Sequence, residues 1–299
     1  MGAAMDPIRT LNEEIENLVI GFQEVPALDI EGCRVVYQGV LGAYSQQAML
    51  QFFGSRCENY HVKTFGDAME AIQKGEADYA VLPIENSSAG IVSENYDLLA
   101  SYDNYIIGEQ KIAVAHALLG LPGTTREQIR AVYSHPQALM QCADYLDLHR
   151  EWEAISAKNT AVAARKIRED GRMDQAAIAG KITADLYGLQ VLEENIQDNK
   201  HNTTRFIIIT SRQVYCRDAK HVSICFEIPH ESGSLYHILS HFYFTGINMV
   251  NIQSRPIPER NWEYRFFVDF EGNLNDQMVR KVLRRLEEDT VKLKILGTY

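Results

Sequence analysis

The residues best suited to chemistry in this sequence come directly before a short apolar run, Phe206 to Ile209. Thr203 and Thr204 carry hydroxyl groups, and Arg205 carries a cation. A short run rich in β-branched residues is typical of a central strand covered on both faces, so the polar residues are expected at a fixed strand end. Open α/β sheets bind ligands at such ends. The alternative is that these side chains only solvate an edge of the sheet.

Four other polar clusters lie where a strand is expected to end or a helix to begin. Unpaired backbone N–H groups and the helix dipole favour anions at such places. Each cluster also has a purely structural explanation, because Ser and Asn cap helices, Pro suits the first helical turn and Gly turns the chain. Together they predict one cleft lined with small donors and few formal charges. The clusters are GAYS at 42–45, ENSSAG at 85–90, SHPQA at 134–138 and KNT at 158–160.

The composition excludes several classes of protein. The 299 residues suffice for two domains with a sizeable core, and an apolar content of 46% excludes a disordered chain. A net charge of -11 argues against a general nucleic-acid or anionic-membrane surface. The five cysteines show no CxxC spacing, which indicates reduced thiols rather than disulfides or structural zinc. Since neither a run of about 18 apolar residues nor a signal-peptide pattern occurs, we expect a soluble cytoplasmic protein.

The elements that must position the polar clusters alternate between strand and helix, which implies parallel pairing with crossover helices. The strand at 205–210 is expected to return to the first of two lobes, which leaves a cleft between them. The first lobe is expected to contain strands at 33–38, 60–65 and 78–84 and helices that end at 53, 74 and 101. The second is expected to contain strands at 104–120, 131–134, 152–156 and 176–180 and helices at 136–148, at 160–169 and after 180.

The two ends of the chain differ from this pattern. Residues 6–24 are expected to form an amphipathic helix with a capping box at Thr10 and Glu13, followed by a linker up to residue 32. After a polar linker at 212–220, the remaining residues follow the ferredoxin-like βαββαβ order. Its strands are expected at 221–228, 247–254, 262–270 and 291–296, and its helices at 234–245 and 275–288.

Several stretches closely resemble the prephenate dehydratase family, in its order and spacing, over roughly residues 33–299. They are QGVLGAYSQQA at 38–48, VLPIENSSAGIV at 81–92, YSHPQALMQC at 133–142, AAIAGKITADLYGL at 176–189, IQDNKHNTTRF at 196–206, and the C-terminal QSRP and NWEYRFFVDFEG. The resemblance implies an α/β protein with a two-lobed, periplasmic-binding-protein-like catalytic domain at 32–212 and a ferredoxin-like ACT regulatory domain at 213–299. Residues 1–31 would be the N-terminal helix and linker. Homodimers or homotetramers are usual in the family.

The resemblance implies conversion of prephenate to phenylpyruvate in L-phenylalanine biosynthesis, without a cofactor. The site must hold a dianion and assist departure of a hydroxyl group, and only interactions that strengthen in the transition state accelerate that step. Thr204 matches the family's catalytic threonine, and we expect it to be a preorganised hydrogen-bond donor. Arg205 is expected to hold a carboxylate or to pair with Glu85 or Asp198. His135 and Glu85 are alternative proton donors.

Neutral groups are expected to position the substrate. By the same resemblance they are Tyr44, Ser45, Asn86, Ser87, Ser88, Ser134 and Gln137, with Phe206 beside them as a side chain that packs rather than reacts.

The resemblance also implies an allosteric phenylalanine site in the ACT domain, built from two motifs. Family members usually have Gly-Ala-Leu in the first and Glu-Ser-Arg-Pro in the second. This chain has Gly233, Ser234 and Leu235, and Gln253, Ser254, Arg255 and Pro256. Because the glutamate charge is lost, we expect weakened or altered inhibition. Many members carry a chorismate mutase upstream, but residues 1–31 supply one helix and few basic residues, so no mutase activity is expected.

Three alternatives remain at the level of the sequence. The same elimination on the aminated substrate would make the chain an arogenate dehydratase. A two-lobed cleft that only binds would make it a non-catalytic sensor of an amino acid or organic acid. His237 and His241 lie four residues apart and could clasp a metal, but they lie opposite the expected buried face, so no metal site is predicted.

Overall fold

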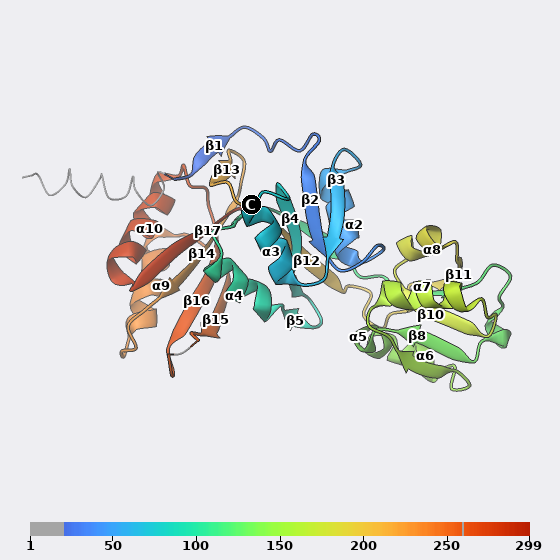
Figure 1. Cartoon of the computed structure of the whole chain (residues 1–299). Helices are drawn as coiled ribbons and strands as arrows, with labels where there is room; N and C mark the ends of the chain where they lie inside the picture. The colour runs from blue at the N-terminus through green and yellow to red at the C-terminus, as the bar shows by residue number, and fades with distance from the viewer. Residues whose placement is uncertain (1–20, 259) are drawn as a thin grey trace, which may run out of the picture.

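Two large sheets organise the computed structural model, which describes residues 21–258 and 260–299 (Figure 1). A ten-stranded sheet runs through the first lobe and the C-terminal region, and a five-stranded sheet forms the second lobe. The chain leaves the first lobe after β6 (Tyr105–Ala113) and returns with β12 (Thr203–Thr210). The predicted return of this strand to the first lobe is therefore confirmed.

Strand β12 is central and covered on both faces, as its apolar run predicts. It pairs antiparallel with β6 on one side and with β4 (Tyr79–Asn86) on the other. Alternate side chains point to opposite faces. Ile207 and Ile209 pack in the cluster beneath α3 (Phe65–Gln73) and α4 (Ser93–Ser101), whereas Phe206 and Ile208 pack against α2 (Tyr44–Phe53). The first lobe is completed by β2 (Arg34–Gln38), β3 (Glu58–Val62) and the short β5 (Gly90–Ile91).

The second lobe stands apart from the rest of the molecule in Figure 1 and carries its own helices. Its strand order is β11-β7-β10-β8-β9, with β10 parallel to β8 and antiparallel to β7. The strands are β7 (Ala117–Gly120), β8 (Ala131–Ser134), β9 (Glu153–Ser156), β10 (Gln175–Ala179) and β11 (Gln190–Glu194). The helices are α5 (Pro136–Met140), α6 (Ala143–Asp147), α7 (Thr160–Asp170) and α8 (Ile182–Tyr187), with a 3₁₀ turn η1 (Arg126–Gln128).

The prediction of a single helix at 136–148 is wrong, because the structure has two separate helices there, α5 and α6. The side chain of Asp198 accepts hydrogen bonds from the backbone N–H groups of Ala143 and Asp144, at 3.1 and 3.2 Å. A carboxylate at this position satisfies donors that begin a helix. A residue more than fifty positions away in the sequence therefore starts α6 anew.

The C-terminal region follows the predicted ferredoxin-like order, in a sheet ordered β15-β16-β14-β17. Helices α9 and α10 pack on one face of this sheet around the buried residues Phe242, Phe270 and Leu286. The elements are β14 (His221–Glu227), α9 (Ser234–Thr245), β15 (Met249–Pro256), β16 (Tyr264–Glu271), α10 (Gln277–Asp289) and β17 (Lys292–Thr298). No helix among residues 21–258 and 260–299 combines the length and apolarity needed to cross a bilayer.

The prediction that the N-terminal helix extends to residue 24 is wrong. Residues Gln23–Val25 form the strand β1, which pairs in parallel with β13 (Val214–Cys216). The expected linker at 212–220 therefore contains part of a small sheet, because the two extended segments satisfy each other's backbone groups. The earlier part of that helix, with its capping box, lies outside the described residues.

The C-terminal region joins the first lobe through a parallel contact between β17 and β6. Gly297 is paired with Ile106, and its backbone has a φ of 140°. A Cβ atom at this position would lie 2.0 Å from the carbonyl oxygen of Ile106. Only glycine fits this close approach of two backbones.

We expect Gly297→Ala to lower the free energy of unfolding by about 2 to 4 kcal/mol, because backbone strain and steric overlap add. Urea unfolding followed by circular dichroism measures the loss. The matched control is Gly171→Ala, which also has a positive φ of 66° but no atom within 4 Å of the added Cβ. Its expected cost is about 1 kcal/mol. Equal losses in the two variants would contradict the close-packing argument.

Candidate active site

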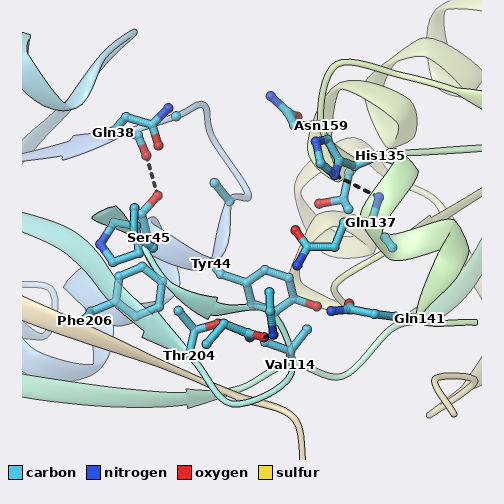
Figure 2. A pocket seen from close by; sticks show the side chains of 18 of the residues that line it. Gln38, Tyr44, Ser45, Val114, His135, Gln137, Gln141, Asn159, Thr204 and Phe206 are labelled. Carbon is cyan, nitrogen blue, oxygen red and sulfur yellow. Dashed lines mark hydrogen bonds between the residues drawn. The ribbon is translucent and has the colours of Figure 1, made fainter. Parts of the chain in front are cut away.

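A cavity of about 460 Å³ lies between the two lobes (Figure 2). All four polar clusters contribute to its wall, together with Thr204 from the start of β12. The lining residues from these clusters are Ala43, Tyr44, Ser45, Asn86, Ala89, Gly90, His135, Gln137, Ala138, Asn159 and Thr160. The structure therefore brings together segments that are far apart in the sequence.

The hydroxyl of Thr204 is oriented by the carboxamide of Asn86. Asn86 Nδ2 donates to Thr204 Oγ1 at 2.9 Å and to Asn202 Oδ1 at 2.8 Å. Asn86 Oδ1 in turn accepts from the backbone N–H groups of Ser88 and Ala89. These contacts fix which end of the carboxamide meets the threonine. Because Thr204 Oγ1 accepts from Asn86, its own proton is left to donate to a molecule in the cavity.

Tyr44, His116 and Gln141 form a chain of polar groups on the cavity wall. The Tyr44 hydroxyl donates to the carbonyl oxygen of Ala115 at 2.9 Å and lies 3.2 Å from His116 Nδ1. His116 Nε2 lies 3.0 Å from Gln141 Oε1. Burial lowers the pKa of His116 and raises the pKa of Tyr44, so both groups favour their neutral forms.

His116 is a cavity residue that the sequence reasoning missed. It lies in the crossover from β6 to β7, and its backbone N–H donates to Gln197 Oε1 at 2.9 Å. The sequence could have indicated His116, because it is the one histidine in the apolar stretch 112–121, where a buried polar side chain needs a hydrogen-bond partner. Gln141 was not predicted as a site residue either, whereas Asn159 belongs to the predicted KNT cluster, and both line the cavity.

The described residues that line the cavity include no Asp, Glu, Lys or Arg. Helices α2, α5 and α7 all begin at its wall, with Ala43, His135 and Asn159 as their N-caps. The N-terminal end of a helix carries a partial positive charge and free N–H groups. The cavity can therefore hold an anion with dipoles and neutral donors alone.

The remaining predicted substrate contacts divide into two groups. Phe206 and Gln137 line the cavity, and Ser45 lines it while its hydroxyl donates to the carbonyl oxygen of Gln38. Three predicted serines are not lining residues, and their hydroxyls bond to the protein itself. Ser87 accepts from the N–H of Thr203, Ser88 accepts from Asn199, and the buried Ser134 donates to the carbonyl oxygen of Ile178.

Arg205 does not line the cavity, so the prediction that it holds a substrate carboxylate is wrong for this structure. Because side chains alternate along a strand, Thr204 faces the cavity and Arg205 faces the other way. Its guanidinium lies 3.3 Å from Asp269 Oδ2, 3.5 Å from Glu85 Oε2 and 3.8 Å from Glu109 Oε2.

The surroundings of Arg205 explain this placement. Burial acts to lower the pKa of Arg205, but Tyr299 and Asp269 outweigh it and raise the pKa overall. The structure shows the alternative pairing of Arg205 with Glu85, whereas Asp198 binds the start of α6 instead.

Of the two alternative proton donors, Glu85 points toward Arg205, and only His135 lines the cavity. His135 Nδ1 accepts from the N–H of Gln137 at 3.2 Å.

Only the first of the two predicted phenylalanine motifs lines a cavity within one chain. Ser234 and Leu235, which follow Gly233, line a second cavity of about 220 Å³ together with Glu263 and Tyr264. The second motif, Gln253, Ser254, Arg255 and Pro256, lies on the edge strand β15 and does not line that cavity. Arg255 instead forms an ion pair with Asp97 of α4 at 2.6 Å.

Residues 35–214 match the family model described as prephenate dehydratase. The chain is 38% identical over 282 residues to "Arogenate dehydratase/prephenate dehydratase 1, chloroplastic" of Arabidopsis thaliana, a match that covers 89% of the chain and 71% of that protein. It is 33% identical over 292 residues to "Bifunctional chorismate mutase/prephenate dehydratase" of Stutzerimonas stutzeri, which covers 96% of the chain and 79% of that protein.

Two solved structures are similar over most of the chain. The prephenate dehydratase of Arthrobacter aurescens in complex with L-Phe has a TM-score of 0.82 and 29% identity, with 89% of each chain covered. A protein described as GqqA, "a novel type of quorum quenching acylases", also has a TM-score of 0.82, at 30% identity, with 89% of this chain and 97% of that chain covered.

The buried His116 predicts a loss of stability in acid. Its folded pKa lies below the ordinary value of 6.5, so the unfolded chain binds the proton more readily. The stability contributed by neutral His116 is complete above about pH 6.5 and is lost as the pH falls toward the folded pKa. We expect the unfolding free energy of the wild type to fall more steeply below pH 6.5 than that of His116→Gln, by up to about 1.4 kcal/mol per pH unit.

Urea unfolding at a series of pH values measures this difference. The matched control is His61→Gln, because His61 is an exposed histidine on β3. Parallel pH curves for the wild type and His116→Gln would contradict the effect of burial.

Proposed function

The chain belongs to the prephenate dehydratase family and is a hydro-lyase, and from this premise we propose that it converts prephenate to phenylpyruvate. In this reaction the ring carboxylate leaves as carbon dioxide and its bonding electrons enter the ring. The ring C–O bond breaks, and the departing hydroxide takes up a proton to become water. Aromatisation drives the elimination, so the protein must orient the substrate and assist the poor leaving group.

The hydrogen bond from Asn86 to Thr204 carries this proposal. It leaves the Thr204 proton as the donor that the departing hydroxyl group needs, at a place fixed by the strand end of β12. A threonine hydroxyl is too weak an acid to give up its proton fully at neutral pH, so it acts as a preorganised donor. His135, which also lines the cavity, is the second candidate for proton donation.

Because the described lining has no Asp, Glu, Lys or Arg, it supports a dianionic substrate that loses one carboxylate. Thr204, Gln137 and Asn159, which are labelled in Figure 2, supply neutral donors from both lobes, and the N-termini of α2, α5 and α7 add their dipoles. A formal cation beside the departing carboxylate would stabilise the ground state and oppose decarboxylation. Neutral donors avoid this effect.

Arogenate is the alternative substrate, since several relatives are named for both activities. Arogenate carries an ammonium group where prephenate carries a keto group. The described lining has no Asp or Glu that would neutralise an ammonium group. We therefore infer a preference for prephenate.

Two other functions are less well supported. A non-catalytic sensor is set aside, because the chain belongs to a family of enzymes. Acyl transfer, named for GqqA, requires a nucleophile with an adjacent general base. The group that contacts Thr204 Oγ1 is the Asn86 carboxamide NH₂, which is a donor and not a base. These contacts favour dehydration.

We further propose that the C-terminal region is an ACT domain that senses L-phenylalanine. A relative was solved in complex with L-Phe. Here the cavity beside Gly233 holds the first motif, whereas the second lies on an exposed sheet edge. A second copy of the chain that brings its β15 to this cavity would complete the site, so we propose at least a homodimer.

We expect Thr204→Ala to lower kcat for prephenate by about 10² to 10³, because one preorganised donor is lost. Thr204→Ser keeps the hydroxyl and is the matched control, with activity much closer to that of the wild type. The assay follows phenylpyruvate absorbance with prephenate and, separately, phenylalanine formation from arogenate. Near wild-type activity of Thr204→Ala would remove the catalytic assignment, and a wild type that turns over neither substrate would remove the proposed reaction.

The proposed regulation predicts weak inhibition by phenylalanine, because Gln253 lacks the charge that binds an ammonium group. We expect Gln253→Glu to lower the phenylalanine concentration needed for half inhibition by about tenfold, which corresponds to one charge-assisted hydrogen bond. Gln253→Met, which fills similar space without charge, is the control. Strong inhibition of the wild type at low micromolar phenylalanine would contradict this prediction.

A further inference from the structure

Two histidines and a carboxylate converge on the outer side of the C-terminal helices. His237 and His241 lie one turn apart on α9, and Asp289 is the last residue of α10. The Nε2 atoms of His237 and His241 lie 3.1 and 2.7 Å from the same oxygen, Asp289 Oδ2. One ligand atom from each residue lies within 4.8 Å of the other two. The packing of α9 against α10 therefore adds a third group to the pair of histidines.

We propose that His237, His241 and Asp289 form a binding site for a zinc-class divalent metal ion. Imidazole nitrogen and carboxylate oxygen are ordinary ligands of Zn²⁺, at about 2.0 to 2.2 Å from the metal. Two ligand atoms on a tetrahedron of that size lie about 3.3 Å apart. The two nitrogen-to-oxygen separations, 3.1 and 2.7 Å, lie slightly below that value, and the two histidine nitrogens are within 4.8 Å of each other, so modest side-chain movements would let the three groups surround one ion.

The exposure of the cluster fits a metal bound from solvent. The side chain of His237 is 62% exposed, whereas those of Asp289 and His241 are 31% and 15% exposed. One side of the site therefore faces water, which can supply the fourth ligand. The inner side is held by the packing of the two helices, which fixes His241 and limits the rotamers of Asp289.

The donor set also selects among metals. Two nitrogen ligands favour zinc, cobalt, nickel and copper, whereas magnesium and calcium prefer oxygen ligands. Binding would replace the contacts of the two Nε2 atoms with Asp289 Oδ2 by bonds to the ion and would link the middle of α9 to the end of α10. Since a preformed site binds the folded state alone, the ion stabilises the C-terminal region.

The test uses the full chain without a histidine tag, after treatment with EDTA, titrated with zinc chloride in a calorimeter. We expect one zinc ion per chain and a higher thermal midpoint with zinc than without it. His237→Ala and Asp289→Asn should each weaken zinc binding by about tenfold or more and abolish the thermal shift. His237 is exposed, so its loss leaves the fold intact, and unfolding without zinc verifies this.

Two controls separate this site from nonspecific binding. His61→Ala removes an exposed histidine on the first lobe and should bind zinc as the wild type does. Cobalt should give visible absorption bands of a nitrogen-ligated site in the wild type and lose them in His237→Ala. The proposal is overturned if zinc at submillimolar concentration does not bind the wild type, or if it binds His237→Ala and Asp289→Asn as tightly as the wild type.

Discussion

The join between the first lobe and the C-terminal region depends on the buried charge of Arg205. Its side chain is 14% exposed, and its closest carboxylate, Asp269, is 6% exposed. Taking these charges out of water is costly, and removal of one partner typically costs 3–5 kcal/mol, because it leaves the other unpaired. The Tyr299 hydroxyl, 3.0 Å from Arg205 Nη1, extends the same cluster to the end of the chain. This cluster holds β12 in place at Arg205, which is the residue next to Thr204.

The alternation along β12 explains why one strand serves two purposes. Thr204 and Phe206 face the cavity, and Arg205 faces the C-terminal region. A slip of one residue would exchange these faces. The pairing with β4 shifts between Arg205 and Phe206, where Pro83 lies opposite Phe206. Proline cannot donate to a ladder and is tolerated at such an irregularity. The irregularity therefore sets the register that places each side chain.

Local rules of sequence predicted much of the fold and the general place of the site. The apolar run of β12, the alternation of strand and helix, and the helix starts at Ala43, His135 and Asn159 all follow from nearby residues. The wrong or missing predictions involve partners distant in the sequence. Asp269 lies 64 residues from Arg205, and Asp198, which separates α5 from α6, lies 55 residues from Ala143. Strand alternation alone could have corrected Arg205, since it cannot share a face with Thr204.

The described wall of the cavity, which has no Asp, Glu, Lys or Arg, also has a consequence for turnover. In the proposed reaction a dianion enters and a monoanion remains after carbon dioxide leaves. Some of the polar groups in the wall already have hydrogen-bond partners within the protein, as the Tyr44 hydroxyl has in the carbonyl oxygen of Ala115. When the substrate carboxylate leaves, the groups that held it can therefore bond to such partners or to water. The product is held by fewer contacts than the substrate, and its release does not require breaking an ion pair with the cavity wall.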